Sequence, residues 1–275
     1  MELTAEQFTK LSKLIYRKLG LQFDEKKLYF LNKRVERRIT ELGLKDADEY
    51  LFQLGYCDSS GNEMQALANL VTTNETYMFR EFEQLAGFAD VCLPELIAAR
   101  QKTSDRRIRI WCAGCSSGEE AYTLAIIIRE VFPDARNWDI RIKATDIDEN
   151  MLELARNALY GDRSVKGVPV LYSKHLVPTA AGFRIAPETA RLVTLEKLNL
   201  NDSVQMKAMR SYDFIFCRNV LIYFDDESRR NVVNHFYDSL NPKGYLFLGH
   251  SESVGRITSA FRLKKTAGHL LYTKD

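Results

Sequence analysis

The sequence is poor in the features that mark specialised protein classes. Only 5 of its 275 residues are Cys, an odd number, and only 6 are Pro. So few cysteines argue against a disulfide framework and for a reducing compartment, and the first 20 residues lack the pattern of a secretory signal. The longest apolar stretch, residues 121–128, is far too short to span a membrane. We therefore expect a cytoplasmic protein without direct membrane insertion.

Neither sign of charge is in large excess, because 39 Lys and Arg face 37 Asp and Glu. This balance does not require nucleic acid as a partner, and we expect none. Hydrophobic residues make up 45% of the chain, which excludes disordered, collagen-like and fibrous classes. The charge is unevenly distributed: residues 1–44 hold 10 Lys and Arg against 6 Asp and Glu, a net +4, so the remainder is net −2.

Apolar residues in the first quarter of the chain recur at helical spacing. They predict helices over residues 3–20, 24–42, 46–54 and 62–71. Thr4 and Gln7 have the spacing of a capping box, and Gly20 and Gly43 follow the first two helices as stop signals. We expect an all-helical domain over residues 1–71, followed by a linker over residues 72–90.

The pattern changes after residue 100, where predicted strands alternate with predicted helices. Strands are expected at 107–113, 140–145, 192–198, 213–217 and 245–248, and helices at 119–131, 149–160 and 226–240. Such alternation is typical of a doubly wound α/β domain, with a mostly parallel sheet covered by helices on both faces. We place this domain at residues 91–275. Between about 161 and 191 the alternation lapses, which predicts a small inserted β-subdomain with an antiparallel hairpin at 176–185.

The first predicted strand leads through a small-residue turn directly into a helix. Gly114 and Gly118 would let a ligand approach the backbone of this turn, and Asp146, at the end of the next strand, is placed to bind ribose hydroxyls. Together these residues indicate a nucleoside site. The acidic pair Glu119 and Glu120 would repel a pyrophosphate, so a cationic adenosine ligand fits better than a dinucleotide. Glycine turns also occur in α/β sheets that bind no nucleoside.

Other motifs have simpler explanations. Cys112 and Cys115 form a C-x-x-C pair without a second pair, and the four His residues lack metal-ligand spacing, so we expect no metal site. The sequence at 249–253 resembles a nucleophile elbow but lacks its final glycine, which argues against a serine hydrolase. Arg218, Asn219 and Tyr223 follow a predicted buried strand and could equally be ligand contacts or an ordinary strand end.

Four basic residues share the polar face of the second helix: Lys33, Arg34, Arg37 and Arg38. Only Glu36 opposes them within those turns. A charge run is usually a solvated helix face, but like charges four residues apart repel each other. An acidic partner is therefore favoured, although a nucleic-acid backbone would satisfy the same charge.

In combination, the motifs resemble the chemotaxis-receptor methyltransferases of the CheR type, which are S-adenosylmethionine-dependent protein-glutamate O-methyltransferases. The resemblance extends over nearly the whole chain. It rests on six segments in the same order, at residues 72–80, 111–120, 144–148, 199–200, 216–225 and 249–253. It implies a helical amino-terminal domain, a linker that contributes to the cofactor site, and a Rossmann-like methyltransferase domain with an inserted β-subdomain.

The resemblance also implies roles for individual residues. The cofactor, S-adenosylmethionine, would be contacted by Asn74, Thr76, Arg80, Glu120, Asp146, Asn199, Leu200, Arg218 and Asn219. Arg80 is similar to the arginine that family members place beside the methionine end of the cofactor. Tyr223 is similar to their tyrosine near the transferred methyl group. We expect Arg80 and Tyr223 to orient reacting groups, because a glutamate nucleophile is already ionised at neutral pH.

The implied partners are the cytoplasmic helices of methyl-accepting chemoreceptors, onto which Lys33, Arg34, Arg37 and Arg38 would dock. Some family members also bind a receptor pentapeptide through the β-subdomain, but the stretch at 178–182 is short for that loop, so we expect no such tether. We expect a monomer. A methyltransferase for another substrate, a dehydrogenase and a non-enzymatic cofactor sensor remain as alternatives.

Overall fold

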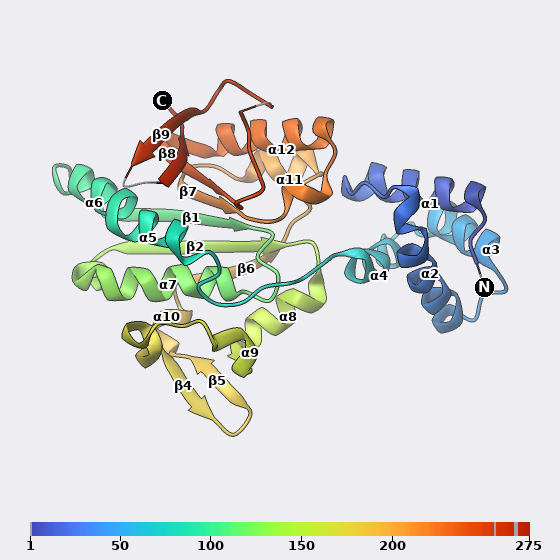
Figure 1. Ribbon diagram of the computed structural model, residues 1–275, viewed down its shortest axis with the longest axis horizontal. Helices are drawn as coiled ribbons and strands as arrows, with labels where there is room; N and C mark the ends of the chain where they lie inside the picture. Colours follow the sequence, from blue (N-terminus) through green and yellow to red (C-terminus); the bar gives the residue numbers. More distant parts are fainter. Residues whose placement is uncertain (1, 256, 267–268) are drawn as a thin grey trace.

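The computed structural model describes residues 2–255, 257–266 and 269–275. A helical domain lies beside a larger α/β domain, and one stretch of chain leads from the first into the second (Figure 1). The helical domain contains α1 (Ala5–Leu19), α2 (Leu28–Leu42), α3 (Ala47–Phe52) and α4 (Asn62–Val71). All four predicted helices are confirmed. The Thr4–Gln7 capping box is formed, and Gly20 and Gly43 end their helices in left-handed conformations.

Buried polar contacts join the helices of this domain. The Glu63 carboxylate of α4 is only 7% exposed. It accepts hydrogen bonds from Arg38 Nε on α2 at 2.9 Å and from the Tyr50 hydroxyl on α3 at 2.8 Å. Arg38 also pairs with Glu41. The contact with Glu63 therefore holds α2 against α4 across the domain interior.

The chain between residues 72 and 81 forms neither helix nor strand, and helices begin again inside the expected linker. Helix α5 (Phe82–Gly87) continues through a π-helical turn (Phe88–Cys92) into α6 (Leu93–Gln101). Sequence analysis placed no helix here. Phe88 explains why this segment is ordered, since its buried ring packs edge-on against Phe214 and Phe216 of the sheet.

The α/β domain is built on a seven-stranded sheet in the order β6-β2-β1-β7-β8-β10-β9. Its parallel strands are β1 (Arg107–Ala113), β2 (Asp139–Asp146), β6 (Val193–Lys197), β7 (Tyr212–Cys217) and β8 (Leu240–Leu248). The chain moves outward in one direction through β1, β2 and β6, and in the other through β7 and β8. The strand order thus reverses between β1 and β7, which is where ligands of open α/β sheets bind.

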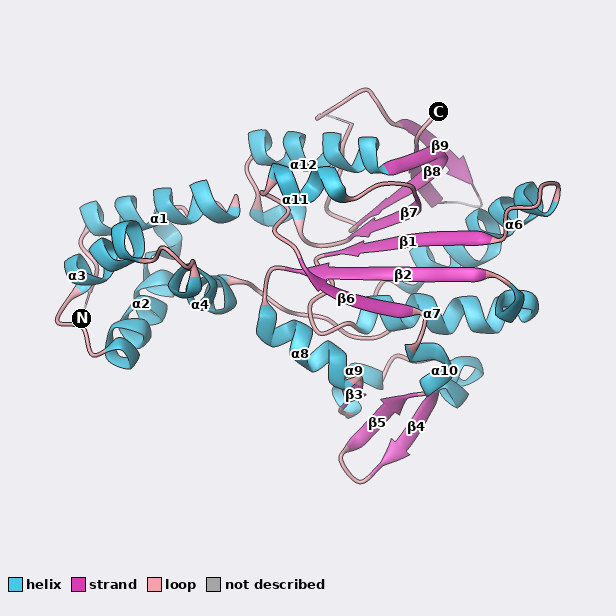
Figure 2. Ribbon diagram, turned by 180° about the vertical axis from the view of Figure 1, so that it is seen from behind, coloured by secondary structure: helices cyan, strands magenta, loops and turns pink. Residues whose placement is uncertain are grey.

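Both faces of the sheet are covered, as the doubly wound prediction requires. The remaining helices include α7 (Glu119–Val131), α8 (Glu149–Asn157), α11 (Ser203–Ala208) and α12 (Asp226–Ser239). Figure 2 shows α11 and α12 on the opposite side of the strands from α8. Alternate residues of β7 enter different cores: Phe214 and Phe216 join the cluster with α7, while Ile215 and Cys217 join that with α12. This alternation explains why β7 is apolar throughout.

The insert forms a separate antiparallel sheet of β3 (Leu159–Tyr160), β5 (Gly182–Ile185) and β4 (Leu176–Thr179), in that spatial order. Small helices α9 (Asp162–Val165) and α10 (Pro187–Ala190) flank it. The predicted hairpin at 176–185 is confirmed. Only Ala180 and Ala181 connect its two strands. Sequence analysis missed β9 (Arg262–Thr266) and β10 (His269–Thr273), an antiparallel pair added beside β8.

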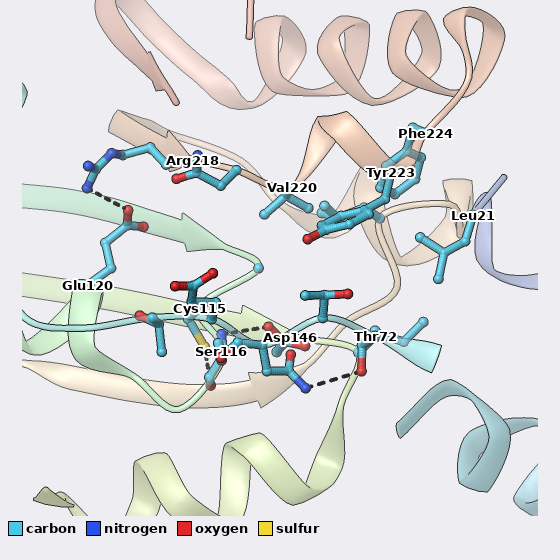
Figure 3. Close-up of a pocket in the computed structure, with 18 of the residues that line it drawn as sticks. Leu21, Thr72, Cys115, Ser116, Glu120, Asp146, Arg218, Val220, Tyr223 and Phe224 are labelled. Carbon is cyan, nitrogen blue, oxygen red and sulfur yellow. Dashed lines mark hydrogen bonds and ion pairs between the residues drawn. The ribbon is translucent and has the colours of Figure 1, made fainter. Parts of the chain in front are cut away.

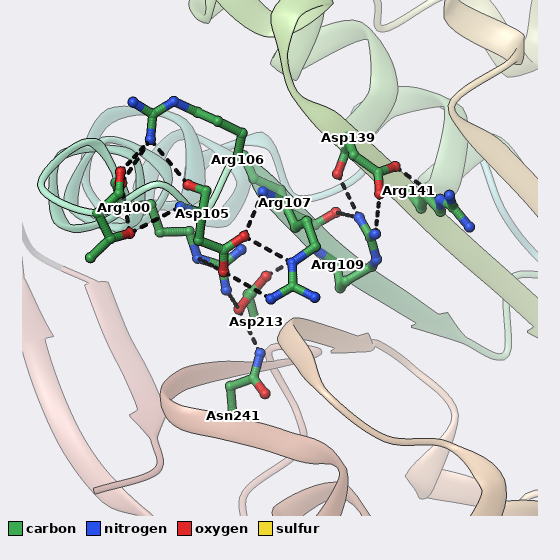
Figure 4. A network of polar contacts seen from close by, with 11 residues as sticks. Arg100, Asp105, Arg106, Arg107, Arg109, Asp139, Arg141, Asp213 and Asn241 are labelled. Carbon is green, nitrogen blue, oxygen red and sulfur yellow. Dashed lines mark hydrogen bonds and ion pairs between the residues drawn. The ribbon is translucent and has the colours of Figure 1, made fainter.

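A network of charges closes the end of the sheet at which β1 and β7 begin (Figure 4). The carboxylate of Asp213, 2% exposed, pairs with Arg100 of α6 and accepts hydrogen bonds from the Arg109 amide at 2.9 Å and from Asn241 at 2.8 Å. Burial raises the pKa of the Asp213 carboxyl. These contacts fix α6 against the sheet and leave the opposite, carboxyl-terminal edge for the pocket.

The contact between Arg38 and Glu63 predicts unequal effects of two neighbouring substitutions. Arg38→Ala should lower the free energy of unfolding by about 3 kcal/mol, because it leaves a buried carboxylate without its cation. Arg37→Ala, at a side chain that is 64% exposed, should change it by less than about 0.5 kcal/mol. Urea denaturation of both variants measures the difference, and equal losses would contradict the structural role of Arg38.

Candidate functional site

The turn between β1 and α7 forms the floor of a pocket at the carboxyl edge of the sheet. The amides of Gly114 and Cys115 donate to the Thr145 carbonyl at 2.8 and 2.9 Å, which fixes the turn against the end of β2. Gly114 has φ +80°, and a Cβ there would lie 2.5 Å from Val220 Cγ2. Only glycine therefore fits this point, where two loops meet.

Asp146 ends β2 beside this turn and is 7% exposed. Its Oδ2 accepts the Ser116 amide at 2.7 Å, and its Oδ1 accepts the Asp148 amide at 2.9 Å. Burial raises the pKa of the Asp146 carboxyl to about 6. The two backbone donors fix the orientation of the carboxylate, and each oxygen keeps a lone pair for a ligand hydroxyl.

Arg218 follows β7 and joins three parts of the chain at the pocket. Its Nη1 lies 3.2 Å from Glu120 Oε2 on α7, and its Nη2 lies 3.2 Å from Glu81 Oε2 and 2.5 Å from the Arg80 carbonyl. Figure 3 shows Arg218 and Glu120 facing each other at one end of the pocket. Burial raises the pKa of the Glu120 carboxyl. The Nε of Arg218 is buried and has no partner within the described chain.

The irregular segment after α4 forms one wall of the pocket. Thr72 and Asn74 both donate to Asp148 Oδ2, at 2.9 and 2.8 Å. Farther along, Phe79 and Glu81 adopt left-handed conformations on either side of Arg80. Arg80 Nη1 donates to the Glu75 carbonyl at 2.6 Å. The contacts with Asp148 attach the segment to the α/β domain, and the contact between Arg80 and Glu75 braces the segment internally.

The helical domain contributes to the same pocket, which sequence analysis did not anticipate. Leu19, Leu21, Phe23 and Phe30 are among its lining residues. A backbone hydrogen bond contributes to the contact between the domains, since the Gln22 amide donates to the Tyr223 carbonyl at 3.0 Å. No spacing in the sequence indicates this contribution, because it arises only when the domains dock.

The pocket brings together every residue that the sequence assigned to the cofactor or to catalysis. Asp146 lies midway along it, and Tyr223 points its hydroxyl into it from the loop after β7 (Figure 3). The lining includes Asn74, Thr76, Arg80, Glu120, Asp146, Asn199, Leu200, Arg218, Asn219 and Tyr223. They come from five separate segments of the chain, so their convergence on one pocket is not a consequence of closeness in sequence.

Comparison with known proteins identifies the family. The model of the CheR methyltransferase all-alpha domain matches residues 6–72, and that of the CheR methyltransferase SAM-binding domain matches residues 74–269. This chain belongs to the CheR methyltransferase family. Chemotaxis protein methyltransferase 2 of Vibrio cholerae is 39% identical over 265 residues, covering 96% of this chain and 91% of that protein. Chemotaxis protein methyltransferase of Escherichia coli is 33% identical over 270 residues, covering 96% and 90%.

The cofactor of this CheR family member is S-adenosylmethionine, and the chemistry of the pocket fits it. The Asp146 carboxylate suits the two ribose hydroxyls, and Leu198 and Leu200 offer apolar contact to a base. The partnerless Nε of Arg218 is a donor suited to the ligand carboxylate.

Among the described residues, no helix combines the length and apolar character needed to span a bilayer.

The basic face of α2 is less free than the sequence indicated. Glu36 is the one acidic residue within those turns, but acidic partners also come from outside them, because Glu41 pairs with Arg37 and Arg38, and Glu63 also pairs with Arg38. Glu41 lies one turn further along α2, and Glu63 lies on α4.

Arg34 also has partners within the helical domain. Its Nε donates to the Leu70 carbonyl at 3.0 Å, and its guanidinium carbon lies 3.4 Å from the centre of the Phe30 ring. Lys33 and Arg37 are the exposed members of the basic set. Lys33 lies over the exposed Tyr29 ring, with Nζ 4.6 Å from its centre.

The raised pKa of Asp146 predicts a pH-dependent affinity. The ionised carboxylate is the better acceptor for ribose hydroxyls, and a pKa of about 6 leaves most of it protonated at pH 5. The Kd for S-adenosylhomocysteine, measured by calorimetry, should rise about tenfold between pH 7 and pH 5. Asp146→Asn should bind weakly at pH 7 and depend less on pH. A constant Kd for the unmodified protein over this range would contradict the assignment.

Proposed function

We propose that this methyltransferase transfers the methyl group of S-adenosylmethionine to glutamate side-chain carboxylates of chemoreceptors. The chain's relatives are named chemotaxis protein methyltransferases, and the observation that carries the proposal is the composition of the pocket. Arg80 and Tyr223 line it, and no histidine does among the described residues. A carboxylate needs no general base, because its pKa of about 4.3 leaves it ionised at neutral pH. A site that orients groups without removing protons suits this nucleophile.

S-adenosylmethionine supplies a methyl group on a sulfonium centre, so a carboxylate oxygen forms the new bond to carbon while sulfur keeps the electrons of the broken bond. The protein must therefore hold the receptor carboxylate in line and exclude water. Arg80, fixed by the Glu75 carbonyl, would attract the incoming carboxylate. The Tyr223 hydroxyl would donate a hydrogen bond to orient it.

The reaction product separates this proposal from its alternatives. Methyl-labelled S-adenosylmethionine should label a chemoreceptor cytoplasmic fragment, and mild base should release the label as methanol. Ester formation explains that lability, since amide, ether and N-methyl products survive mild base. Label that stays on the receptor fragment, or no transfer at all, would contradict glutamate esterification.

Substitution of the two orienting residues should slow the chemical step. Tyr223→Phe and Arg80→Ala should each lower the single-turnover methylation rate by about tenfold or more, because a hydrogen bond to a charged group contributes about 1.5–3 kcal/mol. Tyr223→Phe should leave the Kd for S-adenosylhomocysteine within about twofold. Unchanged single-turnover rates in both variants would show that neither residue orients the reacting groups.

Receptor docking is proposed for the basic face of α2, tested at its exposed members. The double variant Lys33→Glu, Arg37→Glu should raise the KM for the receptor fragment while the Kd for S-adenosylhomocysteine stays constant. Arg34 and Arg38 are unsuitable for this test because their contacts stabilise the fold. The matched control, Lys13→Glu with Arg17→Glu, applies the same charge change on α1. Equal KM values for all three proteins would exclude docking on α2.

A further inference from the structure

A turn after β8 directs a glutamate back toward the cofactor pocket. The Glu252 amide donates to the Gly249 carbonyl at 2.9 Å, which closes a turn over residues 249–252. Val254, 1% exposed, is buried just beyond it in the core that contains α12. Because β7 and β8 are parallel neighbours, with Cys217 paired to Leu248, the turn lies beside the loop that follows β7.

The Glu252 carboxylate accepts three backbone hydrogen bonds there. Its Oε2 accepts the amides of Asn219 at 2.8 Å and Gly249 at 2.7 Å, and its Oε1 accepts the amide of Val220 at 2.9 Å. These lengths lie within the normal range for N–H···O hydrogen bonds. The carboxylate thus satisfies two successive donors of the loop after β7.

The loop held in this way carries proposed site residues on both sides of the contact. Arg218 immediately precedes it, and Tyr223 follows it by three residues. Asn219 itself has φ +61°, a conformation that costs free energy in a non-glycine residue. The hydrogen bonds that the amides of Asn219 and Val220 donate to Glu252 therefore stabilise a backbone conformation that is unfavourable without them.

Gly249 makes the approach possible. A Cβ at this position would lie 2.8 Å from the Asn219 nitrogen and 2.9 Å from Glu252 Oε2. Any side chain there would push the turn away from the loop. Gly249 and Glu252 therefore act together. Their contact with the loop after β7 explains two positions of the motif at 249–253, which the hydrolase interpretation did not explain.

We propose that Glu252 is a positioning residue of the cofactor site. It acts through Asn219 and Val220, and it holds the loop in the conformation that presents Arg218 and Asn219 to S-adenosylmethionine. The inference rests on the proposed cofactor contacts of those two residues, and not on the identity of the methyl acceptor.

Calorimetry of the full chain with S-adenosylhomocysteine tests this role. Glu252→Gln should raise the Kd at least tenfold, because an amide has one acceptor oxygen and its NH₂ group would face at least one loop donor. Loss of folded protein alone would lower the measured number of sites and leave the Kd of the folded fraction unchanged. The control, Glu95→Gln, loses contacts with Tyr245 and Lys264 away from the pocket, and its Kd should stay within threefold.

A second variant keeps the test informative if Glu252→Gln does not fold. Gly249→Ala retains the carboxylate but displaces the turn, and it should also raise the Kd at least threefold. The inference is overturned if every variant that folds binds within threefold of the unmodified protein. Asp146→Asn distinguishes a failure of the proposed role of Glu252 from a failure of the proposed cofactor site, since it changes the site without touching this loop. If Asp146→Asn weakens binding and the loop variants do not, only the role of Glu252 fails; if none weakens it, the site itself is misassigned.

Discussion

The buried guanidinium of Arg218 connects the parts of the chain on which the site depends. A buried cation is stable only where ionised or polar partners surround it. Arg218 has Glu120 from α7, and Glu81 and the carbonyl of Arg80 from the end of the linker segment. The turn after β1, the linker and the loop after β7 must therefore come to one point. The requirement to satisfy one buried charge thus assembles three segments that are far apart in sequence.

Domain docking completes the pocket from the other side. Asn199 donates to the Lys18 carbonyl at 2.7 Å, so a residue of the α/β domain satisfies the free end of α1. The Tyr16 hydroxyl donates to Asp225, the residue that caps α12, at 2.9 Å. The same docking brings Phe23 and Phe30 to the pocket. In this arrangement the helical domain is both a wall of the cofactor site and the carrier of the proposed receptor-docking face.

The sequence predicted those parts of the structure whose pattern lies within one short stretch of chain, and it did not predict contacts between distant stretches. The strand–turn–helix of residues 107–131 was predicted to the residue, because apolar periodicity and glycine position are local properties. Helix α5 and the π-helical turn after it were not predicted, although Leu85, Phe88, Ala89 and Cys92 have helical spacing and are buried. This spacing is a local property of the sequence and was sufficient to predict a helix here. Strand β9 offered little signal, because it is an edge strand whose Leu263 is exposed. Partners such as Glu63 for Arg38 come from another helix and cannot be read from spacing.

The central claim is that Arg218 organises the cofactor site through its planar guanidinium and not through its charge alone. Arg218→Lys tests this most directly, because lysine keeps the charge but cannot reach Glu120, Glu81 and the Arg80 carbonyl together. Titration calorimetry with S-adenosylhomocysteine should give a Kd at least tenfold higher for Arg218→Lys, with the number of sites near that of the unmodified protein. An unchanged Kd would contradict the account, because it would show that the site forms without this contact.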